Sequence, residues 1–183
     1  MNYVEPIRDA RTVRDIADYL KEKGEKYYIM YMVGIHSGLR ISDILRLKVR
    51  DVRGKDRIKI REKKTGKEKI FPITKELGAA LAAYCEGKKD YQYLIPSDRA
   101  MNKAISRQYA YVVIREAGEA FGLDSVGTHT LRKTFGYHFY MQTKDVVLLM
   151  RIFNHSAEST TLRYIGVEQT TIDAAYKRFK YGF

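Results

Sequence analysis

The chain has 183 residues, which is enough for one domain with a real core and too short to require two. Its 34 lysines and arginines exceed its 22 aspartates and glutamates, and the formal charge of +12 predicts attraction to a polyanion, most often nucleic acid and sometimes an anionic membrane surface. No apolar run approaches the ~18 residues of a membrane span, and the amino terminus lacks a signal-peptide segment, so we expect a soluble, cytoplasmic protein.

Cysteine and histidine usage argues against disulfides and metal sites. Cys85 is the only cysteine, which excludes an internal disulfide framework and the usual cysteine-based zinc sites. The four histidines are scattered, and neither an HExxH pattern nor paired carboxylates accompany them. We therefore assign no metal and no cofactor.

The first fifty residues have the periodicity of helices. Thr12 can cap a helix that runs to Gly24, and EKYYIMYMVGIHS predicts a second, strongly apolar helix that ends at Gly38. After GLR, Ser42 can cap a short helix with the sequence ISDILRLK.

A small β-hairpin is expected next, near residues 57–73. The alternation in DRIKIRE and KEKIFPI predicts two strands, and KKTG supplies a turn with lysines at its tip. Thr74 can then cap the helix TKELGAALAAYCEG, and Asn102 opens a further helix that ends at Gly122.

From residue 128 onward the pattern is helical almost without interruption. Three helices are predicted by HTLRKTFGYHFYMQ, KDVVLLMRIF and ESTTLRYIG, and a fourth, amphipathic one at about 168–179. No repeat of fixed period and no internal linker is present. We expect an α+β, mainly α fold, a helical bundle with a small antiparallel sheet, as one domain over 11–183 after a loose lead-in at 1–10.

Four motifs follow one another along the chain: GLRISD at 38–43, KKTGK at 63–67, HTLRKTF at 129–135 and NHSAESTTLRY at 154–164. Each is weak alone, because four histidines and fifteen tyrosines make chance matches common. In this order, and over about 11–179, they closely resemble the catalytic domain of the tyrosine recombinases, also called phage-type integrases.

The resemblance implies a set of site residues. Lys64 is preferred as the hairpin lysine, with Lys63 as the alternative. Asp43 is expected to orient an arginine or the adjacent backbone. Asn154 stands where the family commonly has glycine, and asparagine tolerates the left-handed backbone of a helix-ending turn. The six implied catalytic positions are Arg40, Lys64, His129, Arg132, His155 and Tyr164.

These residue types suit cleavage of a DNA phosphodiester. Two arginines supply permanently charged, fork-shaped donors for the five-coordinate transition state. A free tyrosine has a pKa of ~10, so its proton must leave during attack, and the family role makes His129 the acceptor. Lys64 is expected to protonate the leaving 5′ oxygen, and His155 to donate to a non-bridging oxygen. The implied 3′-phosphotyrosyl intermediate needs neither metal nor ATP.

Three functions are compatible with this chemistry. The first is a site-specific recombinase or integrase, the second a type IB topoisomerase that rejoins the original strand, and the third a DNA-binding regulator whose catalysis has lapsed. The short layout and the NHSxxSTTxRY spelling favour the recombinase, and six filled positions argue against a lapsed site. The target sequence, and whether a mobile element is integrated or excised, is not readable from these residues.

The expected partner is double-stranded DNA. In the resembling family, a helix after the tyrosine packs on a neighbouring protomer, so we expect a monomer in free solution and a homotetramer on DNA. Most relatives also carry an amino-terminal domain that clamps DNA, and here it would be absent or supplied by another domain or protein. With fewer phosphate contacts, we expect weak, salt-sensitive DNA binding.

Overall fold

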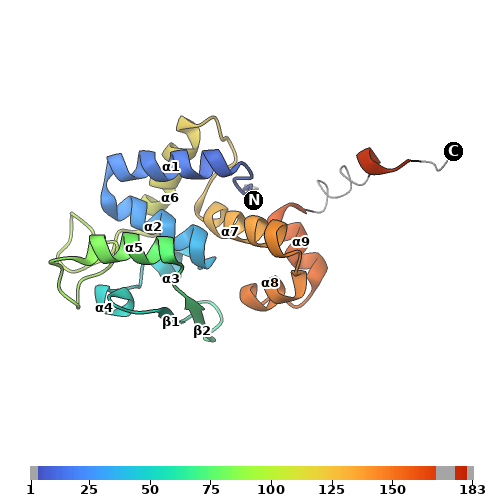
Figure 1. Cartoon of the computed structure of the whole chain (residues 1–183). Helices are drawn as coiled ribbons and strands as arrows, with labels where there is room; N and C mark the ends of the chain where they lie inside the picture. The colour runs from blue at the N-terminus through green and yellow to red at the C-terminus, as the bar shows by residue number, and fades with distance from the viewer. Residues whose placement is uncertain (1–3, 168–175, 181–183) are drawn as a thin grey trace.

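The computed structural model describes residues 4–167 and 176–180. Helices dominate this part of the chain, and one two-stranded antiparallel sheet accompanies them, so the predicted mainly α fold is confirmed (Figure 1). The elements are α1 (Ala10–Lys23), α2 (Glu25–Ser37), α3 (Ile41–Ile44), α4 (Val49–Val52), β1 (Arg57–Arg61), β2 (Glu68–Pro72), α5 (Lys75–Cys85), α6 (Arg107–Ala120), α7 (Thr128–Thr143), α8 (Val146–Phe153) and α9 (Glu158–Ile165).

Helix α2 lies at the centre of the molecule. It is apolar around most of its circumference and contacts α1, α5 and α7, as expected of a helix that is hydrophobic on all sides. Its approach to α7 depends on Gly34, where an added Cβ would lie only 2.6 Å from the Leu131 side chain. The close packing of α2 on α7 brings the GLRISD motif, which follows α2, close to the HTLRKTF motif of α7.

A second, smaller apolar cluster joins α7, α8 and α9, which lie together at one side of the molecule (Figure 1). Phe153 and Ile165 are fully buried in it, and both lie against Gly136 of α7. This cluster fixes the face of α9 that carries Tyr164 against α7.

The hairpin forms where the alternation predicts it. Its register pairs Ile58 with Phe71 and Ile60 with Lys69, and Ile58 and Phe71 are buried on its inner face. In Figure 1 the hairpin lies below α3.

Helix α1 begins earlier than predicted. Its cap is Asp9, whose carboxylate accepts a hydrogen bond from the Thr12 N–H at 2.7 Å, so the assignment of Thr12 as the cap is wrong. The residues before it, expected as a loose lead-in, lie against α7. Ile7 is buried, its N–H donates to the Thr134 hydroxyl at 2.9 Å, and its carbonyl lies 2.9 Å from His138 Nε2.

Two further predicted caps are corrected. Helix α3 starts after Arg40, so Ser42 lies inside it. Helix α6 is capped by Ser106, whose hydroxyl accepts the Tyr109 N–H at 3.0 Å, and Asn102 lies in the preceding loop. In contrast, Thr74 caps α5 as predicted.

The predicted carboxy-terminal helix at about 168–179 lies largely outside the described residues. Among the residues that the structure does describe, no helix is both long and apolar enough to cross a membrane. In the same part of the chain, no three or more histidine, cysteine, aspartate or glutamate side chains gather as a metal-binding group.

Candidate active site

Arg132, on α7, connects the end of α2 to the end of α8 through hydrogen bonds. Its side chain is buried, and it donates to the carbonyls of Gly38 at 2.6 Å and Phe153 at 2.9 Å. Its guanidinium also lies 4.2 Å from the centre of the Phe153 ring. These contacts join the end of α2 to the end of α8 and fix a permanent positive charge between them.

Arg40 enters the site through a tight turn at the end of α2. Gly38 has a left-handed backbone (φ +61°), and an added Cβ there would lie 2.4 Å from the Phe135 ring, so glycine is required. Two residues later, Arg40 Nη1 lies 2.8 Å from the carboxylate of Glu62. Glu62 follows β1 and is buried.

Glu62 keeps its negative charge despite its burial. Burial alone would raise the pKa of Glu62, but hydrogen bonding from Thr65 and the charge of Arg40 outweigh it and hold that pKa below its usual value. The Thr65 hydroxyl donates to Glu62 at 2.8 Å, and the Asn154 amide at 3.4 Å. Glu62 therefore links the arginine of GLR to the hairpin and to the residue before His155.

Asp43 holds the hairpin from the other side. It is fully buried, and its carboxylate accepts the backbone N–H of Lys63 at 2.8 Å. Of the two expected partners, an arginine or the adjacent backbone, the hydrogen bond is to the backbone of the hairpin, and the guanidinium of Arg46 lies 3.8 Å from the same carboxylate. The turn of the hairpin is thus fixed at Lys63.

Tyr164 and His129 face each other across α9 and α7. The phenol oxygen lies 3.4 Å from His129 Nδ1, a long contact of the kind that shortens only when substrate binds. Burial raises the pKa of Tyr164, although the charges of Arg132 and Arg40 oppose the increase. Desolvation and the charge of Arg132 lower the pKa of His129. At neutral pH the pair is therefore a neutral phenol beside a neutral imidazole that can accept its proton.

His155 completes the cluster at the end of α8. Asn154 adopts the left-handed conformation (φ 55°, ψ 42°) that the sequence predicted, and the chain turns there. The His155 imidazole then packs edge-on to Tyr164, with ring centres 5.3 Å apart, and its Nδ1 lies 3.0 Å from the buried Thr161 hydroxyl. Burial and the charge of Arg132 lower the pKa of His155.

Five of the six predicted catalytic residues thus converge, and Lys64 is the exception. Lys64 and Lys63 both lie at the exposed tip of the hairpin. Sequence reasoning missed Lys69, whose ammonium is buried near Arg132 and Arg40. The signal that could have found it is its place on β2, where strand alternation puts it on the same face as Phe71.

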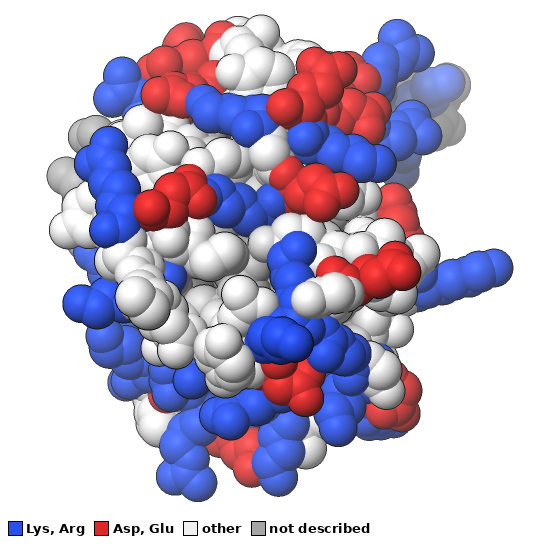
Figure 2. Space-filling model, turned by 90° about the vertical axis from the view of Figure 1, so that its left-hand side faces the viewer, with Lys and Arg blue, Asp and Glu red and all other residues white. Residues whose placement is uncertain are grey.

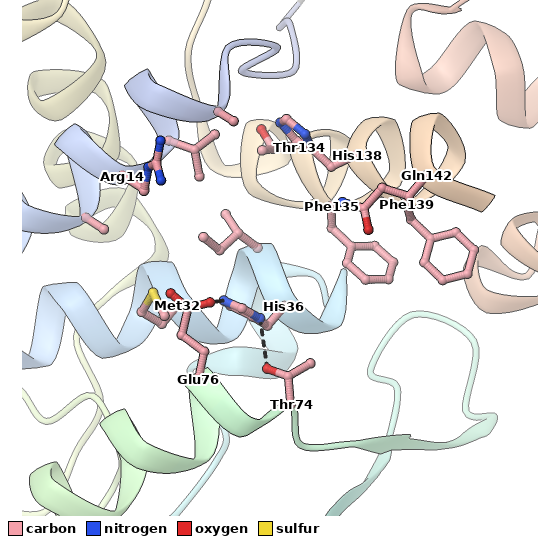
Figure 3. Close-up of a pocket in the computed structure, with 14 residues that line it drawn as sticks. Arg14, Met32, His36, Thr74, Glu76, Thr134, Phe135, His138, Phe139 and Gln142 are labelled. Carbon is pink, nitrogen blue, oxygen red and sulfur yellow. Dashed lines mark hydrogen bonds and ion pairs between the residues drawn. The ribbon is translucent and has the colours of Figure 1, made fainter. Parts of the chain in front are cut away.

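The other two histidines, His36 and His138, line a separate cavity. A cavity of about 570 Å³ lies between α1, α2, α7 and the start of α5, and Figure 3 shows His36 and His138 on its wall. His36 Nδ1 lies 2.9 Å from the Thr74 hydroxyl, and its Nε2 lies 3.7 Å from the Glu76 carboxylate. None of the six predicted catalytic residues lines this cavity.

The surface carries the positive charge that the composition predicts. Figure 2 shows acidic and basic side chains mixed over the upper part of one face. Basic side chains gather in its lower part, on the side of the molecule where α4 and the hairpin lie in Figure 1. Such a distribution attracts a phosphate backbone.

Comparisons with known proteins place the chain in a family. The phage integrase family matches residues 8–170. The chain is 47% identical over 179 residues to the probable integrase/recombinase YoeC of Bacillus subtilis, with 98% of each chain covered. It is 27% identical to the tyrosine recombinase XerA of Pyrococcus horikoshii, covering 94% of this chain and 59% of the relative.

A solved structure shares the fold. The XerH site-specific recombinase, in a post-cleavage complex with its palindromic difH substrate, superposes with a TM-score of 0.72 at 16% identity, over 97% of this chain and 54% of that one. With the family match over most of the chain and the site geometry described above, this protein belongs to the phage integrase family of tyrosine recombinases, enzymes that break and rejoin DNA.

Proposed function

We propose that this protein is a site-specific DNA recombinase or integrase that works through a 3′-phosphotyrosyl intermediate. The observation that carries the proposal is the position of the Tyr164 phenol, 3.4 Å from the imidazole of His129 and within the fields of two arginines. A nucleophile beside a neutral base and fixed positive charges is what phosphoryl transfer requires.

The cleavage step follows from these positions. The Tyr164 oxygen attacks the scissile phosphorus while His129 takes the phenol proton. Arg40 and Arg132 stabilise the charge on the non-bridging oxygens, and His155 donates a hydrogen bond to one of them. The bond from phosphorus to the 5′ oxygen breaks, and the leaving alkoxide takes a proton.

Lys64 is the proposed donor of that proton. It lies in the exposed turn of the hairpin, between Lys63, whose N–H is held by Asp43, and Thr65, whose hydroxyl is held by Glu62. With the backbone on both sides of Lys64 held, rotation of its long, exposed side chain would bring the ammonium to the 5′ oxygen of bound DNA. Lys63 remains the alternative residue for this role.

Rejoining is the same reaction in reverse. The phosphotyrosyl bond keeps the free energy of the broken phosphodiester, so a 5′ hydroxyl can attack it with no ATP. The charge stabilisation comes from Arg40, Arg132 and His155, so the mechanism uses no metal.

The proposed substrate is double-stranded DNA, in keeping with the net charge of +12. XerH, which shares the fold, is bound to a DNA substrate in its crystal structure. We propose a monomer in free solution and a homotetramer on two duplexes.

A type IB topoisomerase would use the same cleavage chemistry but rejoin the same strand. The relatives named integrase and recombinase favour strand exchange. A supercoiled plasmid with two copies of the DNA that flanks the gene for this protein separates the two activities. We expect recombinant circles that require both copies. Relaxation that needs only one copy, without recombinants, would favour the topoisomerase instead.

A further inference from the structure

Lys69 occupies a position that strand geometry reserves for an apolar side chain. Alternate residues of a strand face opposite sides of its sheet, so Lys69 shares a face with Phe71. Its partner across the hairpin is Ile60, and both Phe71 and Ile60 are buried. Ile70, between Lys69 and Phe71, is 51% exposed. The hairpin thus directs a lysine inward and an isoleucine toward solvent.

The Lys69 ammonium has no hydrogen-bond partner among the described residues, although its nitrogen is buried. An unpaired buried charge is costly, and its presence in a folded protein asks for an explanation. Burial lowers the pKa of Lys69 to about 8, and the charge of Arg132 acts in the same direction.

The charges around Lys69 are those of the active site. Its ammonium interacts with Arg132 and Arg40 and with the carboxylates of Glu62 and Asp43. Lys69 therefore adds a positive charge to the cluster that would bind the scissile phosphodiester.

We propose that Lys69 is a further catalytic residue, whose ammonium donates a hydrogen bond to a non-bridging oxygen of the scissile phosphate beside Arg40 and Arg132. This role rests on the proposed phosphoryl transfer. It differs from that of Lys64, because Lys69 lies on β2 rather than at the exposed tip, and its nitrogen is already buried among these charges.

Lys59 provides a matched control. It lies on β1 of the same hairpin, but its side chain is 66% exposed, and it pairs with Glu68 at 3.0 Å.

Cleavage of a nicked suicide duplex would be followed in a single turnover for Lys69→Met, Lys69→Arg and Lys59→Met. For Lys69→Met we expect the cleavage rate to fall by about 100-fold or more, as when one transition-state hydrogen-bond donor is removed. The DNA affinity of this variant should change by less than about fivefold. Lys69→Arg should cleave about tenfold faster than Lys69→Met. The cleavage rate of Lys59→Met should stay within about threefold of the wild-type rate.

A modified substrate separates charge stabilisation from a structural role. A methylphosphonate at the scissile position replaces one charged non-bridging oxygen by a methyl group, so the defect of Lys69→Met should shrink to about tenfold or less. A full defect on this duplex would overturn the proposal in favour of a structural lysine. Rescue of Lys69→Met by a 5′-bridging phosphorothiolate, whose sulfur leaves without a proton, would also overturn it, because Lys69 would then be the proton donor.

A measurement without DNA keeps this proposal distinct from the proposed function. Inorganic phosphate should raise the melting temperature of the wild type and of Lys59→Met by more than that of Lys69→Met, because the buried ammonium gains an anion. If the wild type cleaved no DNA but this difference appeared, the recombinase function would fail and the anion contact would stand. An equal phosphate effect in all three proteins would overturn the contact.

Discussion

At the scale of single residues, the site depends on pKa values that burial moves in opposite directions. Burial disfavours the charged form of any group, so it keeps the Tyr164 phenol protonated and the His129 imidazole neutral. Arg132 and Arg40 lower the pKa of His129 further, because their positive charges repel a protonated imidazole. The nearby arginines therefore prepare the base as well as the phosphate site.

A pH dependence of cleavage follows from the state of His129. The imidazole must be neutral to accept the phenol proton, and its pKa lies below the ordinary value of about 6.5. We expect the single-turnover cleavage rate to fall on the acid side as the pH drops through the lowered pKa of His129. His129→Gln should slow cleavage by on the order of 100-fold and remove this acid limb.

His155→Gln is the control for that profile. A protonated His155 can still donate a hydrogen bond, so its variant should keep the acid limb while cleavage slows. An acid limb centred above pH 7 in the wild type, or one unchanged in His129→Gln, would contradict the role of His129.

At the scale of elements, the sequence predicts what periodicity controls and misses what depends on contacts. Helix α2 and the hairpin follow from apolar runs and alternation, and both form where predicted. The caps Thr12 and Asn102 were wrong because several polar residues near each helix start can cap it, and only the tertiary structure selects one.

The same limit explains which site residues could be predicted. Arg40, Arg132 and Tyr164 were identified by motifs that resemble a known family. Lys69 was not, because a lysine in an alternating strand ordinarily faces solvent. Glu62 was missed for the same reason, since its burial depends on Arg40 and Asn154, which are distant in the chain.

The turn between α2 and α3 gives a prediction for stability. Gly38→Ala would place a Cβ 2.4 Å from Phe135 in a left-handed backbone, so we expect it to lower the free energy of unfolding by about 2–4 kcal/mol. Gly66→Ala is the matched control, because Gly66 has a similar φ of +68° but no neighbouring atom within 4 Å. It should cost about 1 kcal/mol, from backbone strain alone. Urea unfolding measures both values, and equal losses would show that the contact with Phe135 is unimportant.

At the scale of the whole molecule, the net charge of +12 governs binding more than folding. The positive charge favours any DNA through release of counterions, while the catalytic cluster acts on one phosphate. Attraction and chemistry therefore have different salt dependences: DNA binding should weaken with salt much more than the rate of cleavage within the bound complex.

DNA affinity tests this separation. We expect binding weaker than nanomolar at physiological salt, and a steady fall in affinity between 50 and 200 mM salt, measured by fluorescence anisotropy with a labelled duplex. Nanomolar affinity at physiological salt, or an affinity independent of salt, would contradict the expectation of few phosphate contacts.

Covalent attachment of Tyr164 to DNA is the step on which the proposed function depends, and trapping the covalent complex would detect it. Nicked suicide duplexes tiled from the DNA flanking the gene would be incubated with the protein, and the covalent product digested and mapped by mass spectrometry. We expect a 3′-phosphate adduct on the Tyr164 peptide, absent in Tyr164→Phe and retained in Tyr140→Phe. An adduct that persists in Tyr164→Phe, or no adduct despite measurable DNA binding by the wild type, would contradict it.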